Sequence, residues 1–105
     1  MNEVVHSVNG APIRLRSERW MHVVEHHEDL AGHFHAVLET VRSPDAVYEG
    51  DGGELLAVSS RFTPYSLVVA YREISSSDGF VITAFFTRRI GRIEGRRLVW
   101  KRELS

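Results

Sequence analysis

The sequence predicts a single α+β domain over residues 1–105, in which an N-terminal β-hairpin and two helices pack on one face of a four- to five-stranded antiparallel sheet. Three observations support this prediction. Asn9-Gly10 is a strong hairpin turn signal between two β-prone segments. Residues 17–42 place apolar side chains at helical spacing. Residues 47–102 contain short, alternating apolar runs that are separated by turn residues.

The hairpin comes first in the chain, with its strands expected at residues 4–8 and 13–16. The second of these strands reads Ile13-Arg14-Leu15-Arg16. Because side chains alternate along a strand, its isoleucine and leucine lie on one face and its arginines on the other.

Two adjacent helices are expected to follow. The first should cover residues 17–27, with Ser17 as its N-cap. Its buried stripe is expected to consist of Trp20, Val23, Val24 and His27. The second helix should cover residues 28–42, with Gly32 weakening it only slightly. Its core stripe is expected to consist of Leu30, Phe34, Val37, Leu38 and Val41.

The sheet follows the helices, and its strands are expected at 47–49, 54–61, 65–73, 80–87 and 97–102. Residues 90–94 can form a turn of helix. The strand at 80–87 has two faces of different chemistry. Its wholly apolar face, expected to meet the helices, consists of Phe80, Ile82, Ala84 and Phe86. Its other face, expected to be open to solvent, consists of Val81, Thr83, Phe85 and Thr87.

The composition is that of a soluble globular protein without cysteine, which excludes disulfide frameworks and thiolate chemistry. No apolar stretch approaches the roughly 20 residues of a membrane span, and the N-terminus has no signal-like apolar run. We therefore expect a cytoplasmic protein with no membrane partner. The net charge is −1, yet residues 1–87 carry −6 and residues 88–105 carry +5. A basic end suits a polyanionic partner, although the acidic part of the chain could also neutralise it.

Arg19, His22 and His26 form a narrow strip on the first helix, since their spacing keeps them within about 60° of one another. Imidazoles exchange protons near neutral pH, and guanidinium groups bind phosphate through paired hydrogen bonds. The strip therefore fits acid–base chemistry on a phosphodiester. Two other interpretations remain open: an ordinary solvated helix surface, and a zinc site that uses the two histidines. A third zinc ligand would have to come from His33, His35 or Glu25.

Further groups that could hold RNA lie later in the chain. The candidate phosphate- and RNA-binding cations there are Arg88, Arg89 and Lys101. The hydroxyls that could orient a phosphate belong to Thr83, Thr87 and Tyr71. No P-loop, GxGxxG, GxSxG or paired catalytic carboxylate motif is present, so nucleotide hydrolysis, hydride transfer and serine hydrolase chemistry have no support.

Five motifs occur in order along residues 11–102: Ile13-Arg14-Leu15, Glu18-Arg19-Trp20-x-His22-x-x-x-His26, Pro44-Asp45, Tyr71-Arg72, and the run from Asp78 to Thr87. In this order they resemble small phage and bacterial domains of the barnase–EndoU–colicin–RelE nuclease superfamily. The resemblance implies two helices on an antiparallel sheet, and RNA cleavage without a metal. It also implies that a helical histidine, sheet hydroxyls and basic groups surround the scissile phosphate. In this chain those groups would be His22 or His26, Thr83 or Thr87, and Arg88 or Lys101.

The leading hypothesis is a metal-independent ribonuclease-like domain of a toxin or phage-derived effector, without a cofactor. It would cleave RNA by attack of the ribose 2′-OH, with His22 as general base and His26 as general acid. Phosphate binding and orientation would fall to Arg19, Arg88, Thr83 and Thr87. RNA would be the substrate, and an antitoxin or immunity protein the neutralising partner. The alternative is a non-catalytic RNA- or protein-binding module of the same fold.

Overall fold

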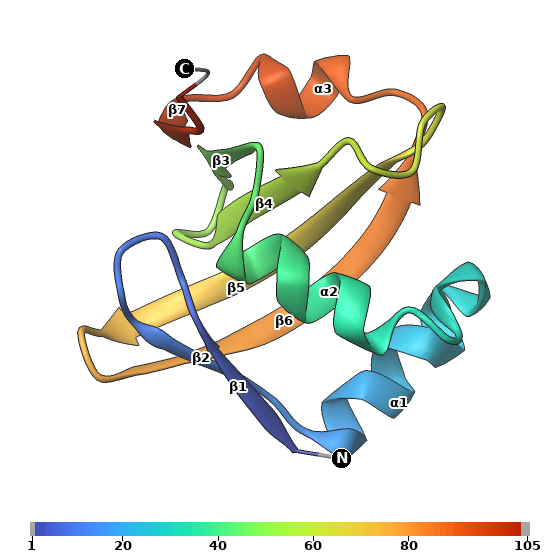
Figure 1. Ribbon diagram of the computed structural model, residues 1–105, viewed down its shortest axis with the longest axis vertical. Helices are drawn as coiled ribbons and strands as arrows, with labels where there is room; N and C mark the ends of the chain where they lie inside the picture. The colour runs from blue at the N-terminus through green and yellow to red at the C-terminus, as the bar shows by residue number, and fades with distance from the viewer. Residues whose placement is uncertain (1, 104–105) are drawn as a thin grey trace.

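The computed structural model describes residues 2–103 (Figure 1). The strands are β1 (Glu3–His6), β2 (Pro12–Leu15), β3 (Ala46–Glu49), β4 (Leu55–Ser59), β5 (Ser66–Ser75), β6 (Asp78–Thr87) and β7 (Leu98–Lys101). The α-helices are α1 (Ser17–His26), α2 (Phe34–Arg42) and α3 (Gly91–Glu94), and a short 3-10 helix, η1, spans Glu28–Leu30. The fold class is α+β, as predicted. Within this part of the chain no helix has both the length and the apolar character needed to cross a membrane.

All seven strands form one sheet, in the order β1-β2-β6-β5-β4-β3-β7. β2 and β6 run parallel, with Arg14 opposite Phe80, and the other neighbouring strands are antiparallel. The predicted four- to five-stranded antiparallel sheet was therefore wrong in both size and strand direction. The N-terminal hairpin does not pack on the sheet but extends it, because β2 hydrogen-bonds to an edge of β6 that would otherwise be unpaired.

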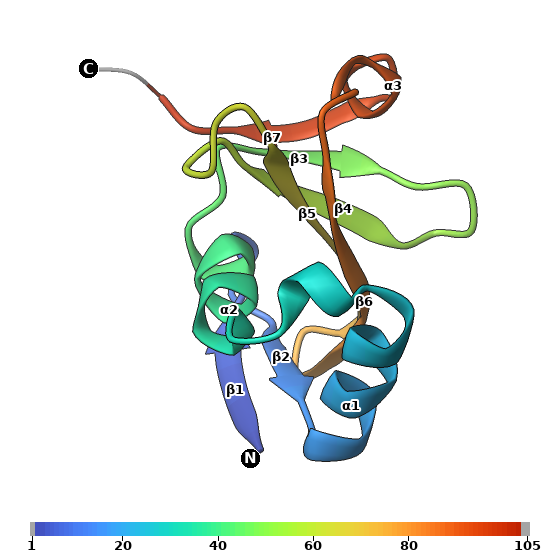
Figure 2. The same ribbon diagram turned by 90° about the vertical axis from the view of Figure 1, so that its right-hand side faces the viewer.

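The sheet curls around α2, which contacts β1, β4 and β5 (Figures 1 and 2). Val37 and Val41 of α2 are fully buried in the main core, together with Leu67 and Val69 of β5. α1 lies beside β6 instead (Figure 2). Only one residue of α1, Val23, is fully buried, so this helix is less deeply packed than its predicted stripe implied.

The face of the sheet that points away from α2 is not open. It carries a second core of Leu56, Val58, Val68 and Ala70, all buried. Ile90, just before α3, and Ile93, within α3, pack on this second core. The expectation of one solvent-exposed face was therefore wrong, because β4 and β5 are apolar on both sides and both sides need cover.

The chain from 28 to 42 is divided into η1 and α2 rather than forming one helix. Gly32 has a φ of +85°, a left-handed conformation that cannot continue a right-handed helix. The helical path already ends at Ala31, whose ψ is 130°, and Gly32 then prevents it from continuing instead of weakening it slightly. His33 follows this break, and its ring lies 5.5 Å from that of Phe62 and 5.3 Å from that of Phe86.

An irregularity in β6 reverses the expected alternation of its side chains. Thr83 is opposite Ala70, but the next pair along the ladder is Val81 with Tyr71, so one extra residue is inserted in β6. Ala84 belongs to the main core and Phe86 packs against it, as predicted, but Val81 also joins that core. Ile82 packs against the second core, and Phe80 lies opposite Arg72 rather than in the main core. The two-faced pattern was correct only for the second half of the strand.

Candidate functional site

A cavity lined by several charged side chains lies where β2, the start of α1 and the start of β6 meet. Its volume is about 490 Å³. We call it the Arg–His pocket, and it is lined by Arg14, Arg16, Glu18, Arg19, His22, Phe80 and Val81. Two of the sequence candidates, Arg19 and His22, are therefore in one cavity.

Local sequence explains why the pocket lies at this junction. In β2, Ile13 and Leu15 are fully buried, so the alternating Arg14 points to the other face of the strand. Arg16 alone connects β2 to α1 and occupies the N-cap position, one residue earlier than the Ser17 cap we expected. The N–H of Ser17 donates to the Asn2 side-chain oxygen at 3.1 Å. The buried Val23 fixes α1 against the core, which leaves the opposite side of the helix to solvent.

The Arg–His pocket has more positive than negative side chains in and around it. The Arg14 guanidinium pairs with the Asp78 carboxylate and lies 5.7 Å from the centroid of the Phe80 ring. Arg16 and Arg19 are exposed, and neither forms an ion pair with a carboxylate among residues 2–103. Three arginines against Glu18 and Asp78 leave a formal charge of +1. The pocket can therefore attract an anion through groups that are not already paired.

His22 and His26 are both exposed, and their ring centroids are 4.4 Å apart. The His26 Nδ1 lies 2.9 Å from the His22 carbonyl oxygen, to which its N–H donates. Rings this close leave no room for a phosphate between them. Attack by a 2′-OH needs the base and the acid on opposite sides of phosphorus, since the attacking and leaving oxygens are in line. The geometry therefore does not support His26 as the acid partner of His22.

The two threonines of the hypothesis do not line the Arg–His pocket. Thr83 is half-buried opposite Ala70, on the face that carries the second core. The Thr87 hydroxyl accepts a hydrogen bond from the Arg89 N–H at 2.9 Å, which fixes the turn after β6. The expected convergence of the helical strip with these hydroxyls is absent from this pocket.

Tyr71 is also not available to RNA. Its side chain is fully buried in the main core, and its hydroxyl has no hydrogen-bond partner among the described residues. Burial raises the pKa of this phenol, and the nearby charge of Glu73 raises it further. Tyr71 is therefore a core residue and not part of a binding surface.

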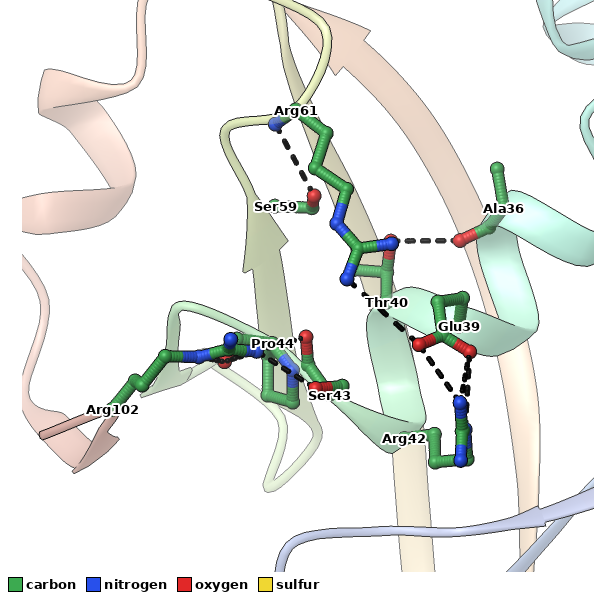
Figure 3. Close-up of polar contacts among 9 residues, drawn as sticks. All are labelled: Ala36, Glu39, Thr40, Arg42, Ser43, Pro44, Ser59, Arg61 and Arg102. Atoms are coloured by element: carbon green, nitrogen blue, oxygen red, sulfur yellow. Dashed lines mark hydrogen bonds and ion pairs between the residues drawn. The ribbon is translucent and has the colours of Figure 1, made fainter.

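The basic C-terminal segment is partly neutralised by the rest of the chain. Arg96 forms two hydrogen bonds with Asp51, at 2.7 and 3.1 Å, which lower the pKa of that carboxyl. Arg97 pairs with Glu49 at 3.1 Å. Arg102 donates to the carbonyl oxygen of Ser43 at 2.8 Å and to that of Pro44 (Figure 3). These arginines stabilise the fold around β3 and β7.

The remaining basic candidates lie away from the Arg–His pocket. Arg88 follows β6, and its guanidinium carbon is 5.6 Å from the centroid of the Tyr65 ring. Arg89 is exposed beside it, and Lys101 is exposed on the edge strand β7. None of the three lines the pocket. They make no ion pair with a carboxylate within residues 2–103.

The zinc alternative finds little geometric support. Among the described residues, no group of three or more His, Asp or Glu side chains lies close enough together to hold a metal ion. His22 and His26 could supply two ligands, whereas a structural zinc site has four.

Five lining residues of the pocket were not among the candidate site residues from sequence: Arg14, Arg16, Glu18, Phe80 and Val81. The alternation along β2 did place both arginines on one face, which was a usable signal. Only the parallel pairing of β2 with β6 brings Phe80 beside them. No family model, curated protein or solved structure matches this chain, and its function is therefore argued from the Arg–His pocket itself.

Proposed function

We propose that this chain is an RNA-binding domain whose Arg–His pocket holds a phosphate of the RNA backbone. The proposal rests on one observation: the guanidinium groups of Arg16 and Arg19, which form no ion pair within residues 2–103, share a cavity with the His22 imidazole and the Phe80 ring. Guanidinium groups bind phosphate with matched geometry. An aromatic ring next to them suits a ligand that joins an anionic phosphate to a flat base.

Removal of the two unpaired arginines tests the binding. In fluorescence anisotropy with a labelled single-stranded RNA, we expect Arg16→Ala/Arg19→Ala to bind about tenfold more weakly at low salt. Each lost phosphate contact should also reduce the slope of log affinity against log salt by about 1. Titrations at about 50 mM and about 200 mM salt measure both effects.

Arg42→Ala is the matched control for these two changes. Arg42 is equally exposed, lies on α2 and pairs with Glu39 at 2.8 Å, outside the pocket. The Arg42→Ala protein should bind RNA with the affinity and the salt dependence of the wild type. Equal affinity and equal salt dependence for the wild type and the double variant would refute the proposed site.

Cleavage of the bound RNA is the second candidate function, favoured by the exposed imidazole of His22 in the same cavity as the arginines. In such a reaction His22 takes the proton from the ribose 2′-OH, and the 2′-oxygen bonds to phosphorus. The bond from phosphorus to the 5′-oxygen then breaks, and the leaving oxygen takes a proton from water. The hydroxide that remains takes the proton from the His22 imidazolium. The products are a 2′,3′-cyclic phosphate and a free 5′-hydroxyl, and no metal takes part.

The cleavage hypothesis predicts that RNA is cut in the presence of EDTA, and that His22→Ala lowers the rate by about 100-fold. His6→Ala is a suitable control, since His6 is an exposed histidine on the edge strand β1, outside the pocket. End-group analysis of the products should detect the cyclic phosphate. Binding without any cleavage by the wild type would leave RNA binding as the whole function, and a rate unaffected by His22→Ala would exclude His22 as the base.

A further inference from the structure

A second cavity, which the RNA proposal does not use, lies near the far end of β6. Its volume is about 530 Å³. We call it the aromatic pocket, and it is lined by Asp29, His33, Phe62, Thr63, Tyr65 and Phe86. Asp29 belongs to η1, His33 follows the break at Gly32, and Phe86 belongs to β6.

Four aromatic rings form the walls of this pocket at steep angles to one another. The Phe62 and Phe86 planes meet at 72°, with centroids 5.3 Å apart. The Tyr65 and Phe86 planes meet at 68°, with centroids 6.3 Å apart. The His33 ring is inclined at 89° to Phe62 and 83° to Phe86. Tyr65 is 45% exposed, so one wall of the pocket borders solvent.

The charge of the lining favours a cation. Asp29 is the one formally charged side chain among the lining residues, and no lysine or arginine lines the cavity. The faces of aromatic rings carry negative potential and attract cations within about 6 Å. Arg88 already illustrates this attraction, since its guanidinium carbon lies 5.6 Å from the centroid of Tyr65.

We propose that the aromatic pocket binds an alkylated ammonium group, such as a quaternary ammonium or a trimethylated lysine side chain. Alkylated ammonium ions are weakly hydrated and present an apolar surface, so they lose little on entering a mainly aromatic cavity. A primary ammonium would need several hydrogen-bond acceptors, and the lining offers few besides the Asp29 carboxylate and the Thr63 hydroxyl. The Asp29 carboxylate then balances the charge of the ligand.

A pair of isosteric ligands tests the role of the positive charge. Choline and its neutral isostere 3,3-dimethyl-1-butanol have nearly the same shape, and NMR titration of the whole chain can follow both. We expect choline to bind about tenfold more tightly and to shift resonances of the pocket residues. Comparison with a trimethyllysine peptide distinguishes a free small molecule from a modified protein as the better ligand. Equal binding of choline and the isostere, or no binding of either cation, would overturn the proposal.

Exposed residues provide variants that leave the core intact. Asp29→Asn should weaken choline binding about threefold to tenfold, whereas Glu28→Gln, an equally exposed acid on the same turn that does not line the cavity, should not change it. Tyr65→Ala should weaken choline binding more than Asp29→Asn does. Arg88→Ala should strengthen binding severalfold, because it removes a competing cation from Tyr65.

Arg88→Ala also separates this proposal from a nucleobase site. If the aromatic pocket instead stacks a base of an RNA, the charge of Arg88 assists the ligand and the variant should bind more weakly. Adenosine that binds more tightly than choline, together with weaker RNA binding by Arg88→Ala, would overturn the ammonium proposal. Loss of RNA binding in the Arg16→Ala/Arg19→Ala variant has no bearing on this pocket, so the two proposals fail independently.

Discussion

Gly79→Ala is expected to lower the free energy of unfolding by about 3 kcal/mol, which is close to the upper end for overpacking a well-packed core. Gly79 is buried in β6, directly before the residue that pairs with β2. A Cβ at this position would lie 2.5 Å from the Ile13 Cδ1, 2.6 Å from the Arg72 carbonyl oxygen and 3.1 Å from the Pro12 carbonyl oxygen. The two oxygens belong to the backbone, so they cannot move without disturbing the ladder on both sides of β6.

Urea unfolding of purified protein measures this loss. Gly52→Ala is the matched control, since a Cβ there meets no atom closer than 3.5 Å, and its stability should change by less than about 1 kcal/mol. Ile13→Val removes the Cδ1 atom and should partly rescue Gly79→Ala while leaving the clash with Arg72. A fully stable Gly79→Ala protein would show that β2 and β5 do not approach Gly79 as closely as these distances state.

Tyr71→Phe is expected to stabilise the protein by about 1 kcal/mol at neutral pH, because it removes a buried hydroxyl that has no partner among residues 2–103. The effect should grow at alkaline pH. The pKa of Tyr71 is raised above the ordinary value of 10.0 by burial and by Glu73. The wild type therefore keeps this proton when folded and loses it when unfolded, so its stability falls as the pH rises above 10.

The difference in the free energy of unfolding between Tyr71→Phe and the wild type should widen by about 1.4 kcal/mol for each pH unit above the ordinary phenol pKa. Urea unfolding of both proteins at neutral pH and at about pH 11 gives the comparison. Other groups that titrate in this range, including Tyr48, are present in both proteins and cancel in the difference. A less stable Tyr71→Phe protein would mean that the hydroxyl is hydrogen-bonded, and parallel stability curves would mean that folding does not raise the pKa of Tyr71.

Much of the secondary structure could be read from short-range patterns. The turn at Asn9-Gly10 forms as predicted, with Gly10 at a φ of +82°. The helical turn expected at 90–94 is observed as α3, and the last strand lies within its predicted range. These features depend on residues a few positions apart, whose preferred backbone angles are nearly independent of the rest of the fold.

The errors arose where long-range contacts decide the outcome. The inserted residue in β6 is fixed by its register with β5, which no local pattern of Val81 to Thr83 reveals. The break at Gly32 was underestimated, because a glycine tolerates both a helix and the left-handed conformation it adopts here. The candidate site shows the same division: Arg19 and His22 were identified from helical spacing, whereas the Thr83 and Thr87 hydroxyls lie outside their cavity.

The sequence by itself determined an α+β chain and a cationic, histidine-bearing strip along its first helix, because hydrophobic spacing and helix geometry are local properties. Only the tertiary structure decided which groups accompany that strip. The parallel pairing of β2 with β6 placed Phe80 beside the arginines, and ion pairs with Asp51 and Glu49 engaged part of the basic end elsewhere. Strand pairing and charge pairing join residues far apart in the chain, so their outcome depends on the whole fold.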